Sequence, residues 1–246
     1  MFHGIPVIGI VGGIGSGKSF IARLFGELGC EVIDSDQQVS AAYDIPEVQE
    51  TLRKWWGDEV LADEHGGVRR KAIAARIFQN PAERHRLESL IHPIVARLRQ
   101  KQMDQALPRK IRPVAFIWDT PLLFETGLNV SCDAIIFVDA SEAVRMKRVE
   151  EKRGWSAEEL FLREKSQWGL DKKKSMSQYT IVNTASETPP GSPWPSDDLN
   201  EMADPAGGIK YKSGDLSGTP ARNQVRLILS QIVNSLSGSG QATGLQ

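Results

Sequence analysis

Short apolar runs alternate with longer stretches of helical periodicity along most of the chain. Five runs of four or five residues are rich in Val, Ile and other apolar residues, and helical segments separate them. This alternation predicts an α/β fold in which a five-stranded parallel sheet is flanked by helices. The predicted strands cover residues 7–11, 30–33, 114–118, 134–138 and 179–182.

Two helical regions are longer than a simple strand connection requires. Residues 36–107 predict an inserted helical subdomain, in which Asn80 caps a helix that begins at Pro81. Residues 141–176 predict a helical lid, whose second helix opens with the capping box of Ser156 and Glu159. The predicted α/β core is then formed by residues 1–35, 108–140 and 177–236.

The composition changes sharply after Asn183. Residues 184–220 are crowded with Pro, Gly, Ser, Asp and Thr and show no sustained apolar period, so we expect a mobile surface insertion outside the active site. Apolar residues at helical spacing over 225–236 predict an amphipathic helix that packs on the sheet. Residues 237–246 predict a frayed Gly/Ser-rich tail.

Composition argues against several classes of partner and indicates the compartment. The net charge of −1 over 246 residues argues against a general nucleic-acid or membrane-surface binder. Cys30 and Cys132 lie far apart, which favours neither a disulfide framework nor a zinc site and indicates a reducing compartment. The first residues resemble neither a signal peptide nor a membrane-spanning helix, so we expect a soluble cytoplasmic protein.

The strongest motif directly follows the first predicted strand. Residues 12–19 fit the pattern GxxxxGK followed by Ser, which is the phosphate-binding P-loop. Glycines let consecutive backbone N–H groups turn toward phosphate, Lys18 supplies a charge, and Ser19 supplies a hydroxyl for magnesium. The alternative is a glycine-rich turn that binds nothing. The order of strand, loop and apolar helix favours nucleoside triphosphate binding through Gly13, Ile14, Gly15, Ser16, Gly17, Lys18 and Ser19.

Acidic residues follow the second and third predicted strands. Asp34 and Asp36 lie where open α/β sheets bind ligands, and Asp36 there is suited to accept a hydroxyl proton. The alternative is that either carboxylate only caps the next helix. Asp119 is placed to orient magnesium, directly or through water. After it, residues 121–124 form either a wall of the acceptor site or part of the core, and Glu125 either holds a substrate hydroxyl or starts a helix.

Basic residues are concentrated in the predicted lid. Arginines that close over phosphate oxygens stabilise the charge that develops during phosphoryl transfer. We expect two or three of these residues to reach phosphate and the others to be solvated helix charges. They are Arg145, Lys147, Arg148, Lys152, Arg153, Arg163, Lys165, Lys172, Lys173 and Lys174.

Together these motifs resemble the dephospho-coenzyme A kinase family of P-loop kinases. Beyond the P-loop and the Asp34-Ser35-Asp36 motif, the resemblance includes Leu-Ile-His-Pro at 90–93 and Pro-Leu-Leu-Phe-Glu at 121–125. It extends over residues 5–183 and implies a kinase that uses ATP and Mg²⁺ to phosphorylate the ribose 3'-hydroxyl of dephospho-CoA. The helical subdomain at 36–107 corresponds to the CoA-binding domain of the family.

The resemblance also implies roles for individual residues. Asp36 corresponds to the general base, with Lys18, Arg148 and Arg163 as further catalytic residues at the phosphates. Asn183 is expected close to the adenine of ATP. Apart from the resemblance, the residues themselves predict that Ser19 and Asp119 orient magnesium, the latter directly or through water. Acceptor binding is expected at Asp34, His92, Leu122 and Glu125.

The sequence departs from the family pattern at a few positions, and it leaves two other functions open. Phe20 replaces a usual Thr, Lys152 stands where a second lid arginine is expected, and Ser177-Gln178 replaces an Ala-Asp pair. One alternative is a kinase for another small acceptor such as a nucleoside monophosphate. The other is a nucleotide-dependent switch, although no Asn-Lys-x-Asp guanine motif occurs. The sequence does not predict the oligomeric state.

Overall fold

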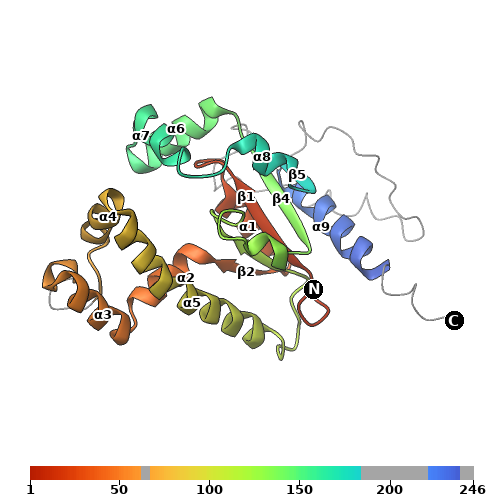
Figure 1. Cartoon of the computed structure of the whole chain (residues 1–246). Coiled ribbons are helices and arrows are strands. Elements are labelled where there is room, and N and C mark those ends of the chain that lie inside the picture. Colours follow the sequence, from red (N-terminus) through yellow and green to blue (C-terminus); the bar gives the residue numbers. More distant parts are fainter. Residues whose placement is uncertain (62–66, 184–220, 239–246) are drawn as a thin grey trace. The chain divides into compact units, whose positions relative to one another are not determined.

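The computed structural model describes residues 1–61, 67–183 and 221–238, without the side chains of Gln79, Ser237 and Gly238. Strands and helices alternate in the described part, as the apolar pattern predicts (Figure 1). All five predicted strands are present, with ends displaced by at most two residues. They are β1 (Val7–Gly12), β2 (Glu31–Asp34), β3 (Phe116–Asp119), β4 (Ala134–Asp139) and β5 (Tyr179–Val182).

The strands form one sheet with the order β2-β3-β1-β4-β5. The pairs β2/β3, β1/β3 and β4/β5 are parallel. All six residues of β1 are buried, because a parallel sheet is covered by helices on both faces. The predicted α/β fold is confirmed.

Two compact units make up the described chain. The first contains Met1–Val11 and Ala22–Ile135, and therefore β1 except Gly12, β2, β3 and the helical insertion. The second contains Gly12–Ile21 and the described residues from Ile136 onward, and therefore the P-loop, the lid, most of β4 and all of β5. Helix α1 (Lys18–Glu27) begins in the second unit and ends in the first.

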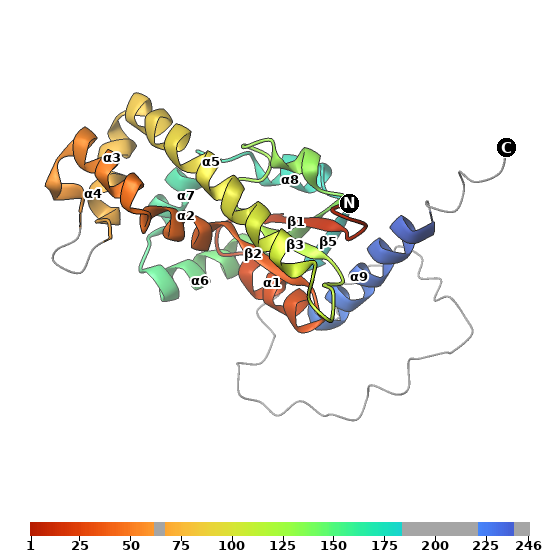
Figure 2. The same ribbon diagram turned by 90° about the horizontal axis from the view of Figure 1, so that it is seen from below.

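The helical insertion of the first unit has a hydrophobic core of its own. Helices α2, α3, α4 and α5 lie together in both views (Figures 1 and 2), and α5 contacts α2, α4 and β2. Their apolar faces meet around buried side chains such as Leu52, Ile73 and Ile91. The elements are α2 (Ser35–Tyr43), α3 (Pro46–Trp56), the short 3-10 helix η1 (Asp58–Val60), α4 (Arg70–Gln79) and α5 (Pro81–Ala106).

Helix signals in the sequence correspond to observed helix ends. The Asn80 side chain accepts hydrogen bonds from the N–H groups of Ala82 and Glu83, at 3.0 and 3.3 Å, and Pro81 is the first residue of α5. Pro93 lies inside this 26-residue helix, where it has no N–H to donate to the preceding turn. The predicted helix start at Pro81 is confirmed.

The second unit contains the helices of the predicted lid and the C-terminal helix. Helix α6 (Glu142–Arg153) is capped by Ser141, and α7 (Ala157–Glu164) opens with the expected capping box. The amphipathic helix expected at 225–236 is α9 (Ala221–Gly238), which buries Val225, Ile228 and Ile232 and contacts β5. The pattern did not predict α8 (Leu170–Ser175) or the 3-10 helices η1 and η2 (Leu128–Ser131).

Some expectations fall wholly or partly outside the described residues. The predicted insertion at 184–220 and the tail from 239 lie there, whereas residues 237 and 238 continue α9. Both cysteines are unbonded thiols, with Cys30 buried and Cys132 half-buried. Over the residues that the structure describes, no helix combines the length and the apolar character needed to cross a bilayer.

Candidate active site

The P-loop connects β1 to α1 through glycines in a conformation that other residues rarely adopt. Gly15 and Gly17 have φ values of 78° and 92°, in the left-handed region. A Cβ atom on Gly17 would lie 2.2 Å from Nδ2 of Asn183, so this position also lacks room for a side chain. The loop shape therefore depends on glycine at both positions.

Lys18 folds back over the loop. Its Nζ atom donates to the carbonyl oxygens of Gly12 and Gly13, at 3.1 and 2.9 Å. Ser19, the next residue, is exposed in the first turn of α1. The ammonium group and the hydroxyl thus lie at the helix N-terminus, where the backbone also attracts anions.

Arg148 and Asn183 contact the carbonyl oxygens of the loop. Nη1 of Arg148 donates to Ser16 O at 3.1 Å and to Gly15 O at 3.5 Å. Nδ2 of Asn183 donates to the same Ser16 oxygen at 2.8 Å, and the Asn183 side chain is almost wholly buried. Nη2 of Arg148 reaches Asn183 O and Oδ1, each at 3.4 Å. These contacts fix the backbone of the loop.

The second predicted lid arginine has different neighbours. Arg163 is exposed, and its guanidinium lies 3.9 Å from the centre of the Trp155 ring, with Arg153 4.7 Å from the same ring. A cation over an aromatic face is attracted to the ring electrons, which holds Arg163 on Trp155. The structure therefore brings Arg148, but not Arg163, to the P-loop.

Arg145 also contacts the P-loop, although the sequence analysis placed it among the lid charges without a specific role. Its side chain is buried, donates to Ile14 O at 3.3 Å and pairs with Glu164. The sequence does contain a signal for this contact. Residues three apart in a helix share a face, and Arg145 lies three residues before Arg148.

The acidic residues of the first unit lie at the carboxyl ends of adjacent strands. Asp34 of β2 and Asp119 of β3 are paired in register. Asp34 accepts hydrogen bonds from the N–H groups of Asp36 and Gln37, at 2.8 and 3.1 Å, and is the N-cap of α2. Asp34 therefore caps α2, while Asp36 is exposed in the first turn of the helix.

Two buried hydroxyl groups connect the ends of these strands. Ser35 Oγ and Thr120 Oγ1 lie 2.7 Å apart, each directly after one of the paired aspartates. Asp119 itself is only 5% exposed. The acidic edge is therefore built on a buried polar contact between β2 and β3.

The apolar segment after Asp119 divides into two kinds of residue. Leu123 and Phe124 are buried in the core, whereas Leu122 is 40% exposed. Glu125 is half-buried. Leu122, Glu125 and the half-buried Pro121 therefore have side-chain surface available to a ligand. The core interpretation holds for Leu123 and Phe124.

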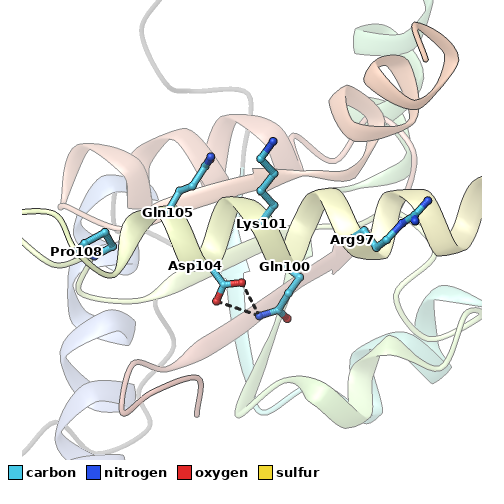
Figure 3. A pocket seen from close by; sticks show the side chains of 6 residues that line it. All are labelled: Arg97, Gln100, Lys101, Asp104, Gln105 and Pro108. Atoms are coloured by element: carbon cyan, nitrogen blue, oxygen red, sulfur yellow. Dashed lines mark hydrogen bonds between the residues drawn. The ribbon is translucent and has the colours of Figure 1, made fainter. Parts of the chain in front are cut away.

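The predicted acceptor residue His92 is exposed on α5. A shallow pocket of about 490 Å³ lies along the same helix, and its lining residues come from successive turns (Figure 3). Within it, Gln100 donates to both carboxylate oxygens of Asp104, at 3.2 and 3.3 Å. None of the predicted site residues lines this pocket, which is formed by Arg97, Gln100, Lys101, Asp104, Gln105 and Pro108.

Comparison with known proteins decides the family. A family model described as dephospho-CoA kinase matches residues 6–188. The chain belongs to the dephospho-CoA kinase family. The resemblance predicted from the P-loop, the Asp34-Ser35-Asp36 motif and the segments at 90–93 and 121–125 is therefore confirmed.

Curated dephospho-CoA kinases are similar over most of their length. The Anaeromyxobacter dehalogenans protein is 37% identical over 179 residues, which cover 72% of this chain and 83% of that protein. The Staphylococcus aureus protein is 33% identical over 180 residues, with coverages of 72% and 84%.

Solved structures share the fold. TT1252 from Thermus thermophilus has a TM-score of 0.65 and 30% identity, covering 74% of this chain and 91% of that one. The dephospho-CoA kinase from Campylobacter jejuni has a TM-score of 0.57 at 21% identity, with coverages of 93% and 98%. At that identity, the second likeness supports the fold alone.

Proposed function

We propose that the protein transfers the γ-phosphoryl group of ATP to the ribose 3'-hydroxyl of dephospho-CoA, giving CoA and ADP. The observation that carries the proposal is the family match over residues 6–188, which includes both the P-loop and the acidic residues of the first unit. The curated relatives carry the name of this activity.

The donor residues are those of the second unit. Backbone N–H groups of the P-loop and the Lys18 ammonium bind the β- and γ-phosphates of ATP. Lys18 then exchanges its contacts with Gly12 O and Gly13 O for phosphate oxygens, which are stronger partners because they are charged. Arg148 supports this loop through Ser16 O, and Arg163 leaves Trp155 to reach phosphate when the lid closes.

Asp36 acts as the general base in the first unit. Its carboxylate accepts the proton of the acceptor hydroxyl while the hydroxyl oxygen forms a bond to the γ-phosphorus. The bond between that phosphorus and the β,γ-bridging oxygen breaks, and ADP leaves with the bonding pair. The exposure of Asp36 suits this role, and the cap made by Asp34 fixes the turn that presents it.

Magnesium fits the residues present. Among the described residues, no three His, Cys, Asp or Glu side chains gather as a metal site. Mg²⁺ bound with a nucleotide takes most of its ligands from phosphate and water, so one hydroxyl and one carboxylate are a sufficient protein contribution. Ser19 and Asp119 have that chemistry. The ion would neutralise charge on the phosphate oxygens.

Acceptor binding is assigned to the helical insertion and the acidic edge. Asp34 and Glu125 have oxygens suited to ribose hydroxyls, Leu122 offers an exposed apolar surface, and His92 is exposed on α5. We propose these residues as contacts of dephospho-CoA, alongside the base Asp36.

The test is turnover by the purified protein with Mg²⁺ and ATP. We expect ADP and CoA to form with dephospho-CoA, and no comparable turnover with nucleoside monophosphates or shikimate. Chromatographic detection of CoA identifies the product directly. Absence of CoA formation by folded protein that binds ATP would overturn the proposed acceptor, and strong preference for GTP would favour a nucleotide switch.

A further inference from the structure

Arg145 is more deeply buried than a solvated lid charge. Only 5% of the residue is exposed, and its Nη1 atom faces two acceptors from different elements. One is the carbonyl oxygen of Ile14 in the P-loop, at 3.3 Å, and the other is the carboxylate of Glu164, the last residue of α7. A buried guanidinium needs such a carboxylate, because removing a charge from water is costly.

The glycines of the loop leave the space that Arg145 occupies. A Cβ atom on Gly13 would lie 2.8 Å from Nη1 of Arg145 and 3.1 Å from its Cδ and Cζ atoms. A Cβ atom on Gly15 would lie 2.7 Å from the carbonyl oxygen of Arg145. The loop therefore packs directly against the side chain and the backbone of this one residue in α6.

The contact with Ile14 fixes the direction of a phosphate-binding N–H group. In a trans peptide the N–H points opposite to the C=O, and the described chain contains no cis peptide. Donation by Arg145 to Ile14 O therefore holds the N–H of Gly15 pointing away from α6. Arg148 acts in the same way on Ser16 O, and hence on the N–H of Gly17.

We propose that Arg145 is a positioning residue for the nucleotide phosphates, and that Glu164 holds its guanidinium on the Ile14 carbonyl. The inference rests on the proposed function, since it assumes that the loop binds ATP. Arg145 acts through the backbone of the loop, so its loss weakens ATP and ADP binding and leaves turnover at saturating ATP nearly unchanged. Through its contacts with Ile14 and Glu164, Arg145 also connects the end of α7 to the P-loop.

Four variants and one control test this arrangement. R145M removes the donor and the charge, R145K keeps the charge with fewer donors, and E164Q keeps an oxygen acceptor without its charge. R145M/E164Q tests whether the two residues act as one unit. The control is K147M, because Lys147 belongs to the same helix but its side chain is 75% exposed and pairs with Glu151 of that helix.

The measurements are Kd for MgATP and MgADP by calorimetry, KM for ATP, and kcat. We expect R145M to raise both Kd values and KM about tenfold, the size of a lost charge-assisted hydrogen bond, with kcat within about threefold. R145K recovers part of the affinity. E164Q gives a smaller increase, and the double variant is no weaker than R145M alone. Hydrogen exchange at residues 12–18 is faster in R145M, and K147M matches wild type throughout.

Other results contradict the inference in distinct ways. If R145M melts at a lower temperature but binds both nucleotides as wild type does, Arg145 has only a structural role. If R145M does not fold, the folded E164Q variant decides, and wild-type Kd values in it overturn the inference. Wild-type protein that binds neither nucleotide contradicts the proposed function itself, whereas normal binding by wild type and all variants contradicts only the role of Arg145.

Discussion

At the scale of single residues, the P-loop glycines have protein neighbours as well as an expected ligand. Glycine at these positions gives the phosphates access to backbone N–H groups. In the structure, the space that a side chain would need at Gly13 is taken by Arg145, and at Gly17 by Asn183. Packing of the loop against the protein therefore disfavours a side chain at both positions, independently of the nucleotide.

Asp36 carries the sharpest residue-scale prediction. Replacing Asp36 by Asn keeps the size of the side chain but removes its capacity to accept a proton. We expect kcat to fall by about 10²-fold to 10⁴-fold, the usual contribution of a general base, while Kd for ATP stays nearly unchanged. Steady-state kinetics and calorimetry on the same preparation measure both.

The matched control for this variant is Asp44→Asn. Asp44 is exposed at the other end of α2, so its substitution changes the same helix and the same net charge. We expect its kcat to equal that of wild type. An Asp36→Asn variant that turns over as fast as the Asp44→Asn control would remove the assignment of the base.

Leu122 and Leu123 are neighbours in different environments, and we predict that truncation of one affects substrate binding and truncation of the other affects stability. Leu123 is fully buried, so Leu123→Ala should lower the free energy of unfolding by about 2–5 kcal/mol. Leu122→Ala should leave stability within about 0.5 kcal/mol of wild type and raise KM for dephospho-CoA. Urea unfolding and kinetics separate the two, and an unchanged KM would exclude Leu122 from the acceptor site.

At the scale of elements, the hydroxyl contact between Ser35 and Thr120 joins the first turn of α2 to the end of β3. Both groups are buried, and each belongs to the residue next to a paired aspartate. A buried hydroxyl that loses its partner is more costly than a pair of apolar groups in the same place. This contact therefore couples the positions of two strand ends.

A double-mutant cycle tests that coupling. Ser35→Ala and Thr120→Val each leave one hydroxyl without its partner, and we expect each to cost about 1–3 kcal/mol of stability. The combined variant should be more stable than the sum of the two costs predicts, because no polar group remains unpaired. Additive effects in urea unfolding would show that the two hydroxyls do not interact.

Elements with local signals were predictable, and those fixed by tertiary contacts were not. The cap at Asn80 and the capping box at Ser156 lie within three residues of their partners, so the sequence alone locates both helix starts. Helix α8 has only six residues and no side-chain cap, and its pattern gave no signal. The sequence left open whether Asp34 is a cap or a ligand, because both roles use the same carboxylate.

In the candidate site, too, features with a local sequence signal were predictable and features fixed by tertiary contacts were not. Motif spacing predicted the P-loop and the acidic strand ends, because phosphate chemistry requires those residue types in that order. The contacts of Arg145 with Ile14 and of Ser35 with Thr120 join residues 131 and 85 positions apart. No local pattern encodes a partner at that distance, so the support of the site became visible only in the folded chain.

At the scale of the whole molecule, the buried thiol of Cys30 and the half-buried thiol of Cys132 make stability depend on alkaline pH. Burial raises the pKa of Cys30 and of Cys132 to about 12, and nearby Asp133 also raises that of Cys132. In the unfolded chain the pKa of a thiol is about 8.5. Above that pH the unfolded state releases protons that the folded state keeps, so stability is lost as pH rises toward 12.

We expect the free energy of unfolding to fall between about pH 9 and pH 10, with up to about 1.4 kcal/mol per pH unit from each thiol. Urea unfolding at several pH values measures this slope. The Cys30→Ala/Cys132→Ala variant serves as the reference, because all other titrating groups are retained. Parallel curves for the two proteins would show that the thiols do not contribute.

The side chain of Gln224 holds α9 against the edge strand β5. Its amide accepts from the N–H of Val182 at 2.9 Å and donates to the carbonyl oxygen of the same residue at 3.0 Å, as a neighbouring strand would. These hydrogen bonds and the apolar face of α9 specify where the helix docks. The length of the chain that connects β5 to α9 does not have to specify it. The chain between β5 and α9 is therefore a place where evolution can insert residues, or an engineer can insert a domain, without changing the nucleotide-binding core.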